Sequence, residues 1–173
     1  VTSCSDCYHA FKLLYPEIGK GANIEILHVT EYLERLIKNR KMKFTKKVPM
    51  LVTYHDPCHL GRRANIYVPG KPIMGVYEPP REILRSIPGI KLVEMYRIKE
   101  YAWCCGAGGG VKEAYPDFSV WTAGERVEEA KETGAEAIVT ACPWCERNFI
   151  DATSEKGDGL KVFDIVELVQ QAI

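Results

Sequence analysis

The chain has 173 residues, 46% of them hydrophobic, and its 23 Lys and Arg residues balance its 23 Asp and Glu residues. This length and composition are typical of one compact globular domain. The zero net charge disfavours a nucleic-acid-binding function, which normally requires a basic excess. The sequence also lacks an apolar run of the ~18 residues that a membrane-spanning helix needs.

The first forty residues combine a cysteine pair with one predicted strand and one predicted helix. Cys4 and Cys7 form a C-x-x-C motif, a common arrangement of metal ligands. A short apolar run predicts a strand at 24–27, and apolar residues at helical spacing predict a helix at 29–39. Because the sequence starts at Val1 rather than at a methionine, we expect the natural chain to extend further upstream.

A buried strand is predicted at 49–54, and a cysteine with neighbouring histidines follows it. Cys58 lies between His55 and His59 in the sequence. Histidine can ligate a metal, move a proton or hydrogen-bond a cluster sulfur. For His55 we favour a structural hydrogen bond, whereas for His59, directly after the cysteine, a functional role is equally well supported.

The next segment, 63–80, breaks the alternation of strands and helices. It is rich in proline and glycine, so we predict an inserted loop that is either functional or a solvated excursion. Beyond it, a short helix is predicted at 81–86 and a strand at 91–95.

Two adjacent cysteines, Cys104 and Cys105, precede a run that reads Gly106-Ala-Gly-Gly-Gly. Glycine permits positive φ and close backbone approach, so N–H groups here would point at a bound cluster. A phosphate-binding loop is the weaker alternative, because the adjacent cysteines give a better reason for the glycines. Trp103, and Trp144 further along, are expected to pack beside the cysteines and shield them from water.

The last third of the chain alternates helices with strands. We predict a helix at 117–133 with Asp117 as its N-cap, then a strand at 137–141, a helix opened by Pro143, a strand at 160–163 and a helix at 164–172. This alternation predicts an α/β fold whose parallel sheets are flanked by helices on both faces.

Most of the cysteines occupy equivalent places in this alternation. They follow strands or open helices, and ligands gather at the carboxyl ends of parallel strands. Helix N-termini at that edge stabilise thiolates. We therefore expect one site formed by Cys58, Cys104, Cys105, Cys142 and Cys145.

The grouping of the cysteines favours ligation over disulfide bonding. Seven is an odd number, and the cysteines fall into two C-x-x-C motifs, one adjacent pair and one single residue. Adjacent cysteines bond each other only with strain. Converging thiolates are typical of a soft metal or an iron–sulfur cluster. A reducing, cytoplasmic location follows from this interpretation.

An internal repeat links the two ends of the chain. Residues 1–7 read Val-Thr-Ser-Cys-Ser-Asp-Cys, and residues 139–145 read Val-Thr-Ala-Cys-Pro-Trp-Cys. Residues 26–33 likewise resemble 162–169. Chance similarity of two strand–helix units is the alternative. The repeat predicts that the chain ends with one complete unit and begins with the tail of an earlier one.

The pattern Cys58…Cys104-Cys105-Gly106…Cys142-x-x-Cys145 resembles the cysteine-rich CCG domain. That domain occurs, usually as two tandem copies, in the B-type and D-type polypeptides of heterodisulfide reductases and in their relatives. The stretch Asp56-Pro-Cys-His-Leu-Gly-Arg62 is most similar to the D-type branch. The resemblance covers the whole chain, with 1–40 as the tail of a first copy and 48–173 as a complete second copy into which 63–80 is inserted.

The resemblance implies pseudo-repeated Rossmann-like lobes with cysteines at the carboxyl ends of strands. It also implies a non-cubane 4Fe–4S cluster, with Cys4 and Cys7 as ligands of the partner copy's metal site. From their places next to the cysteines, we expect Gly106 beside this cluster and His59 in a catalytic role. The ligands of the cluster itself would be the same five cysteines, namely Cys58, Cys104, Cys105, Cys142 and Cys145.

The function implied by this resemblance is that of an oxidoreductase subunit that delivers electrons to a disulfide or thiol-linked substrate. Its partners would be other subunits of an electron-transfer complex: a flavoprotein, a ferredoxin-like protein or a membrane cytochrome. The protein would be cytoplasmic, or attached to the membrane through such a partner. Two alternatives stay open: an electron relay without its own substrate, and a structural zinc–thiolate domain.

Overall fold

A parallel β-sheet forms the centre of the computed structural model, which describes residues 1–19, 23–66, 68–157 and 159–173. In the described part of the chain the sheet has four strands in the order β2-β1-β3-β4, and all neighbours are parallel. The strands are β1 (Met50–Tyr54), β2 (Ile90–Val93), β3 (Ala137–Thr140) and β4 (Lys161–Asp164). The predicted α/β fold is confirmed.

The strand residues explain why this sheet is parallel and covered on both faces. The central strand β3 reads Ala-Ile-Val-Thr, and all four residues are buried. Continuous burial of this kind requires a layer of side chains on each face of the sheet. Val139 accordingly packs in one core cluster with Leu84 and Leu168, whereas the adjacent Ile138 packs in the other with Val127.

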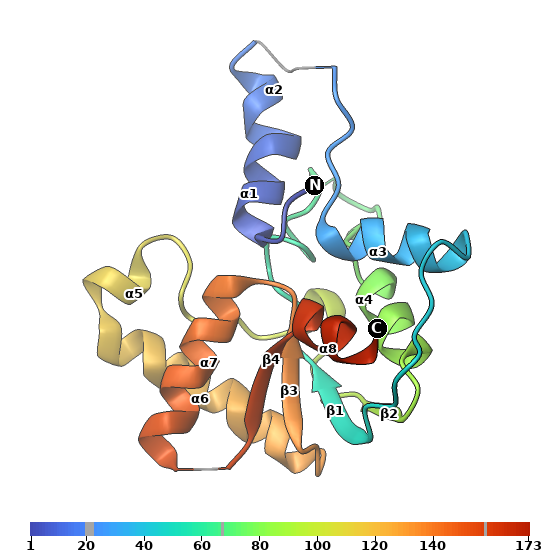
Figure 1. The fold of residues 1–173 in the computed structure, drawn as a ribbon. Helices are drawn as coiled ribbons and strands as arrows, with labels where there is room; N and C mark the ends of the chain where they lie inside the picture. Colours follow the sequence, from blue (N-terminus) through green and yellow to red (C-terminus); the bar gives the residue numbers. More distant parts are fainter. Residues whose placement is uncertain (20–22, 67, 158) are drawn as a thin grey trace.

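Helices supply both layers, as Figure 1 shows: α4 and α8 lie on one side of the sheet and α6 and α7 on the other. The N-terminal helical segment projects away from the sheet at the top of this view. The helical elements are α1 (Ser5–His9), the π-helix η1 (Ala10–Leu14), α2 (Tyr15–Glu17), α3 (Val29–Lys38), α4 (Glu78–Ser86), the 3-10 helix η2 (Lys99–Tyr101), α5 (Val111–Ala114), α6 (Pro116–Glu132), α7 (Pro143–Lys156) and α8 (Ile165–Ala172).

The strand order creates a switch point between β1 and β3. From β1 the chain crosses to β2 on one side, and from β3 it crosses to β4 on the other. Connections that leave two adjacent strands in opposite directions open a crevice at their carboxyl ends, where ligands of α/β folds bind. Cys58 follows β1 and Cys142 follows β3, so the topology directs cysteines to this crevice.

Two separate segments share the same local geometry. Thr2 pairs with His28 in a parallel bridge, and Thr140 pairs with Asp164 in the sheet. In each case the second residue caps a helix: His28 caps α3 and Asp164 caps α8, both through a capping box with a glutamate three residues later.

Some sequence-based expectations differ from the structure. The strand predicted at 24–27 is wrong: a single bridge at His28 takes its place, because Thr2 is the one residue that pairs there among those described. Asp117 is not an N-cap but lies in the first turn of α6, where its carboxylate faces the positive end of the helix. The helix α1, with its continuation through η1 and α2, was not predicted.

The segment after Cys58 is closed at its base. The backbone N–H of Val76 donates to the carbonyl of Leu60 at 3.0 Å, and the N–H of Ala64 donates to the carbonyl of Gly61 at 3.0 Å. Helix α4 starts at Glu78, earlier than the predicted start at 81, because its first turn accommodates prolines that lack an N–H.

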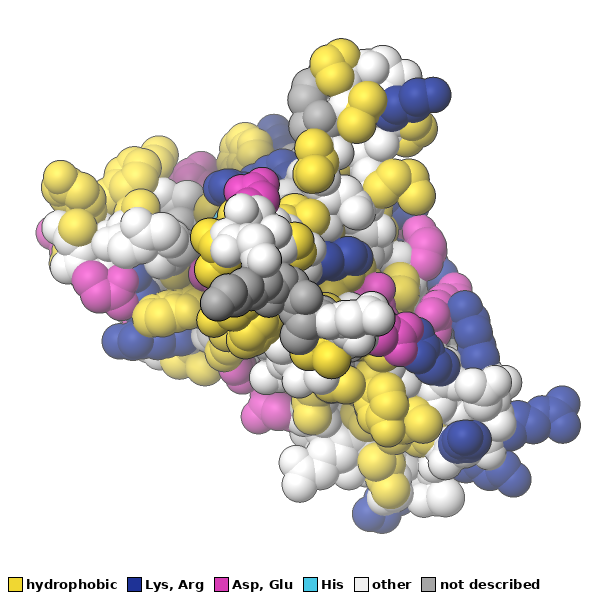
Figure 2. Space-filling model, turned by 90° about the horizontal axis from the view of Figure 1, so that it is seen from above, with side chains coloured by type: hydrophobic (Ala, Val, Ile, Leu, Met, Phe, Trp, Pro, Cys, Tyr) yellow, Lys and Arg dark blue, Asp and Glu magenta, His cyan; other side chains and the backbone are white. Residues whose placement is uncertain are grey.

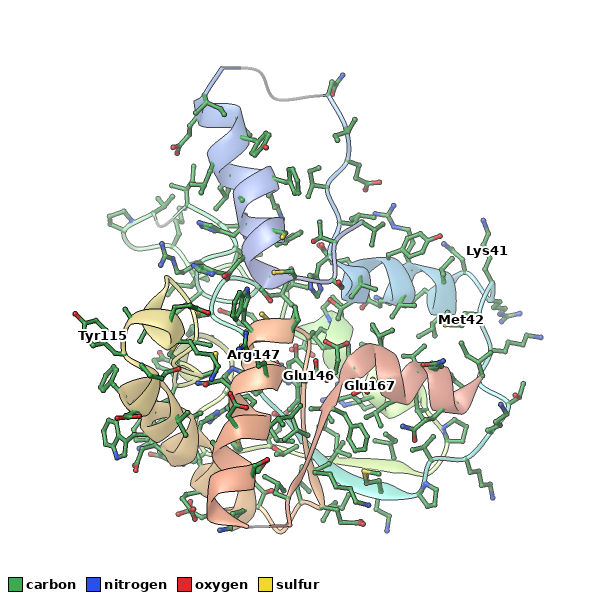
Figure 3. The ribbon with its side chains drawn as sticks, turned by 60° about the vertical axis from the view of Figure 1, so that its left-hand side comes forward. Lys41, Met42, Tyr115, Glu146, Arg147 and Glu167 are labelled. Carbon is green, nitrogen blue, oxygen red and sulfur yellow. The ribbon has the colours of Figure 1, made fainter. Side chains whose placement is uncertain are left out.

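The carboxyl of Asp164 gives the fold a pH dependence. Burial raises the pKa of Asp164 from 3.8 to about 6, and two more carboxylates lie close by, since Figure 3 shows Glu146 at the start of α7 near Glu167 in α8. The folded protein therefore binds this proton more tightly than the unfolded chain does. Its contribution to the free energy of unfolding is complete below pH 3.8 and is lost as the pH rises through about 6.

Asp164→Asn is expected to remove the loss of stability that wild type shows as the pH rises. The variant keeps a side-chain acceptor for the N–H of Val166. The free energy of unfolding of the variant, relative to wild type, should therefore rise between about pH 4 and pH 7. Urea denaturation at a series of pH values measures this difference. A difference that stays constant with pH would contradict the assignment.

Among the described residues, none of the helices is both long enough and apolar enough to cross a lipid bilayer.

Candidate metal centre

Six cysteine side chains form a continuous series of thiol contacts at the carboxyl edge of the sheet. Each makes a hydrogen-bond contact with the next, in the order Cys4, Cys142, Cys145, Cys105, Cys104 and Cys58. The structure thus brings together all five cysteines that the sequence pointed to and adds Cys4 at one end. Cys7 contacts Cys4 but is exposed, and all seven cysteines are free thiols.

The thiol contacts divide the series into thiolates and thiols. Hydrogen bonds from Cys145 and Cys4 hold the pKa of Cys142 far below its usual value, and hydrogen bonds from Cys105 and Cys58 do the same for Cys104. The pKa of Cys105 is raised to about 12 by its contact with Cys104. These lowered pKa values favour the thiolate form of Cys142 and Cys104, and the thiolate is the form that binds metals.

Local structure aims polar backbone groups at these sulfurs. Cys142 is the N-cap of α7, where the helix presents its positive end. Gly106 adopts φ +83° and donates its N–H to the Sγ of Cys104 at 3.3 Å. A Cβ at this position would lie 2.7 Å from the carbonyl oxygen of Ser119, so the loop requires glycine here.

Several residues that position the cysteines were not found from the sequence. Buried Asn148 on α7 donates to the carbonyls of Cys105 and Ser119, and Ser5 donates to the carbonyl of Ala141 at 3.2 Å. For Asn148 the signal was a polar residue within the apolar stripe of its helix. Ser5, which follows Cys4 directly, gave no signal of its own.

A buried ion-pair cluster holds the backbone just before Cys58. Asp56 accepts two hydrogen bonds from Arg81, at 2.7 and 2.8 Å, and a third from the backbone N–H of Lys99 at 2.7 Å. Arg81 also donates to Glu94 at 2.7 and 3.0 Å. The cluster therefore ties the β1 turn to α4 and to the segment that leads to Cys104.

His59 is half-buried and is held by the N-terminal helix. Its Nδ1 contacts a carboxylate oxygen of Asp6, and its ring stacks on that of His9 with centroids 4.8 Å apart. The stack places one imidazole from α1 against one from the β1 turn. Its position beside Cys58 agrees with the sequence, but the partners from α1 were not predicted.

A cavity of about 260 Å³ lies beside Cys104. Its lining is almost entirely apolar and includes Trp103 and Trp121, with Glu125 at its side. Trp103 lies beside Cys104, as expected, and is itself 43% exposed. Arg97 lies over its ring at 3.8 Å, which leaves the indole as one wall of an open cavity.

His55 lies directly behind the cysteines and is fully buried. One of its ring nitrogens and the sulfurs of Cys105 and Cys145 lie within 4.8 Å of one another. Its Nδ1 faces the Nε of Arg126 at 3.2 Å, as the predicted structural hydrogen bond requires. Burial, with Arg126 as the next cause, lowers the pKa of His55 to about 3, so the ring is neutral at physiological pH.

Arg126 was not found from the sequence. It occupies the apolar stripe of α6 together with Ala123, Val127 and Ala130, all of which are 0% exposed. An arginine at a core position of this stripe is the signal that would have revealed it.

Charged side chains of both signs share the face seen from above with hydrophobic ones. Figure 2 shows that no single charge covers this face.

Comparison with known proteins identifies the family. The CCG model, described as a cysteine-rich domain, matches residues 52–150, which is more than half of the chain. A Methanosarcina acetivorans protein, named as the D polypeptide of the dihydromethanophenazine:CoB–CoM heterodisulfide reductase, is 44% identical over 172 residues. That alignment covers 99% of this chain and 40% of the relative.

Two further relatives are named as redox proteins. The B polypeptide of a CoM/CoB fumarate reductase from Methanothermobacter marburgensis is 37% identical over 99% of this chain and 32% of its own length. FadF of Bacillus subtilis, named as a probable iron–sulfur-binding oxidoreductase, is 37% identical over 100% of this chain and 23% of its own length. The chain thus spans two-fifths or less of these relatives, and it belongs to the CCG cysteine-rich domain family.

Proposed function

We propose that this chain is the cluster-binding part of a heterodisulfide-reductase-like oxidoreductase subunit and that it holds a non-cubane 4Fe–4S cluster. The observation that carries the proposal is the continuous series of sulfur contacts from Cys4 to Cys58 at the switch point of the sheet. The names of the relatives, which include an iron–sulfur oxidoreductase and a heterodisulfide reductase component, support it.

The donor set fits a cluster better than a single zinc ion. Structural zinc takes four ligands in a tetrahedron. Here five cysteine sulfurs form one continuous series of contacts, from Cys142 to Cys58. The sulfur of Cys4 extends this series beyond Cys142. Iron–sulfur clusters are held by cysteine thiolates, and N–H groups directed at sulfur tune their potential. Gly106 supplies such a group.

When bound, a cluster of this kind supplies one-electron transfer and iron sites that can bind sulfur. The chain's own residues would hold and frame it. Cys58, Cys104, Cys105, Cys142 and Cys145 would be the ligands. The cavity beside Cys104 would admit a thiol or disulfide, whose apolar part would pack against the indole rings of Trp103 and Trp121. His59, fixed by Asp6 and His9, would hold a proton for the thiol product.

The N-terminal segment would belong to a second metal site. Residues 1–40 repeat the local geometry of the C-terminal strand–helix unit, which supports 1–40 as the tail of a first CCG copy and 48–173 as a complete second copy. Cys4 and Cys7 would then be ligands of the first copy's site. The protein's partners would be further subunits of an electron-transfer complex, and through them it could be attached to a membrane.

Metal and sulfide analysis of the anaerobically purified protein tests the proposal. We expect iron and acid-labile sulfide in equal amounts, about four of each per five-cysteine site, and an electron paramagnetic resonance signal that changes when a thiol substrate is added. Zinc without acid-labile sulfide would refute the cluster. If the electron paramagnetic resonance signal of the cluster stayed unchanged with every thiol and disulfide tested, the result would instead favour an electron relay without its own substrate.

A further inference from the structure

One ring nitrogen of the buried His55 side chain has no hydrogen-bond partner among the described residues. The residue is 0% exposed, and the nitrogen in question is Nε2. An unpaired buried polar group of this kind costs about 1–3 kcal/mol, so such groups normally have a partner. The sulfurs of Cys105 and Cys145 lie within 4.8 Å of one another and of a ring nitrogen of His55.

The other ring nitrogen determines which proton His55 carries. Nδ1 lies 3.2 Å from the Nε of Arg126. A guanidinium can only donate, so Nδ1 must be the acceptor and carries no hydrogen. In a neutral imidazole the hydrogen is then on Nε2. The tautomer therefore follows from the identity of the partner.

Arg126 is itself fixed in this orientation. Its Nη1 donates to Glu129 at 2.6 Å, and Glu129 in turn accepts from the backbone N–H of Arg97 at 2.6 Å. The ring of Phe149 packs nearly perpendicular to that of His55, with centroids 4.8 Å apart. His55 is thus held by a hydrogen bond to its Nδ1 and by an aromatic contact with Phe149.

We propose that the Nε2–H of His55 donates a hydrogen bond to a sulfur of the metal centre and raises its reduction potential. The inference rests on the cluster proposed above and assigns His55 a role as donor rather than ligand. Ligation of iron through Nε2 would require a lone pair on the nitrogen that carries the hydrogen. A hydrogen bond to sulfur stabilises the more negative, reduced form of a cluster, which makes reduction easier.

The test compares His55→Phe, which keeps a flat ring without a donor, with His55→Gln, which keeps an N–H at a similar reach. In each anaerobically purified protein, iron and sulfide are measured first, and the cluster is then titrated with mediators and followed by electron paramagnetic resonance. At a fixed poise, we expect His55→Phe to lower the ratio of reduced to oxidised cluster about tenfold, which is about 59 mV for one electron. His55→Gln should recover most of this change.

Phe149→Leu is the matched control, because it alters the packing against the same imidazole and leaves the donor in place. We expect its potential to stay close to that of wild type. An equal fall in His55→Phe and Phe149→Leu would mean that packing sets the potential and would overturn the proposal. An unchanged potential in His55→Phe, with iron and sulfide at wild-type levels, would overturn it as well.

Spectroscopy of the wild-type protein covers the case in which His55→Phe fails to fold. Electron–nuclear double resonance in H2O and D2O should show a weakly coupled exchangeable proton in addition to that of the Gly106 N–H, and His55→Gln should retain it. A strong nitrogen coupling, as for an iron-bound imidazole, or the absence of this additional proton would refute the hydrogen bond. Absence of iron and sulfide in the wild type would refute the cluster itself, so the two failures are distinguishable.

Discussion

Cys105→Ser is expected to deprive the protein of its metal centre. Cys105 is the middle of the five-sulfur series, because it contacts Cys104 on one side and Cys145 on the other. Loss of an outer partner of a metal ligand already costs ~10–100-fold in metal affinity. Loss of this sulfur should therefore reduce bound iron and acid-labile sulfide by more than about tenfold. Both are measured chemically, together with the visible absorption of the anaerobically purified protein.

Cys7→Ser is the control for that experiment. Cys7 is exposed and contacts the series only through Cys4. The five-cysteine site should keep its iron and its absorption in this variant. An equal loss in the two variants would contradict the assignment of Cys105 to the centre, and wild-type iron content in Cys105→Ser would remove it from the ligand set.

Arg81→Met is expected to produce the largest loss of stability among substitutions outside the cysteines. The Arg81 and Asp56 side chains are 1% and 2% exposed, and removal of the cation leaves the carboxylate of Asp56 buried without its partner. Breaking a buried pair in this way costs about 3–5 kcal/mol. The free energy of unfolding, measured by urea denaturation of the metal-free protein, should fall by this amount.

Arg85→Met provides a comparison on the same helix. Arg85 is exposed, and it pairs with Glu82 and Glu78 at the surface. Surface pairs contribute about 0–1 kcal/mol, so this variant should unfold nearly as wild type does. Similar decreases in the free energy of unfolding in both variants would show that α4 tolerates methionine poorly. They would also mean that the pair with Asp56 does not account for the loss of stability.

Topology explains how much of the site could be predicted from the sequence. Cys58 and Cys142 each follow a buried strand, and parallel strands end at one edge, so their convergence needs no knowledge of side-chain packing. The glycine after Cys105 was equally informative, since the positive φ at Gly106 excludes other residues. The family resemblance rests on these same positions, and the comparisons confirm it.

The parts that could not be predicted depend on contacts between distant segments. Asp6 reaches His59 across 53 positions, and Arg126 reaches His55 across 71. The apolar stripe of α6 marks Arg126 as buried, but the local sequence identifies the partner in neither contact. The strand predicted at 24–27 failed for a related reason: an apolar run becomes a strand only when a neighbour offers a ladder of hydrogen bonds, and Thr2 offers a single bridge there.

The closed base of the segment that follows Cys58 marks a place where the protein can accept insertions without displacing its cysteine site. Because Leu60 and Val76 are already joined by a hydrogen bond, extra residues between them leave both ends where they are. Each doubling of such a loop costs only about 0.6 kcal/mol in closure entropy. The segment is therefore a natural insertion point, at which members of one family can acquire different surfaces around a common chemistry.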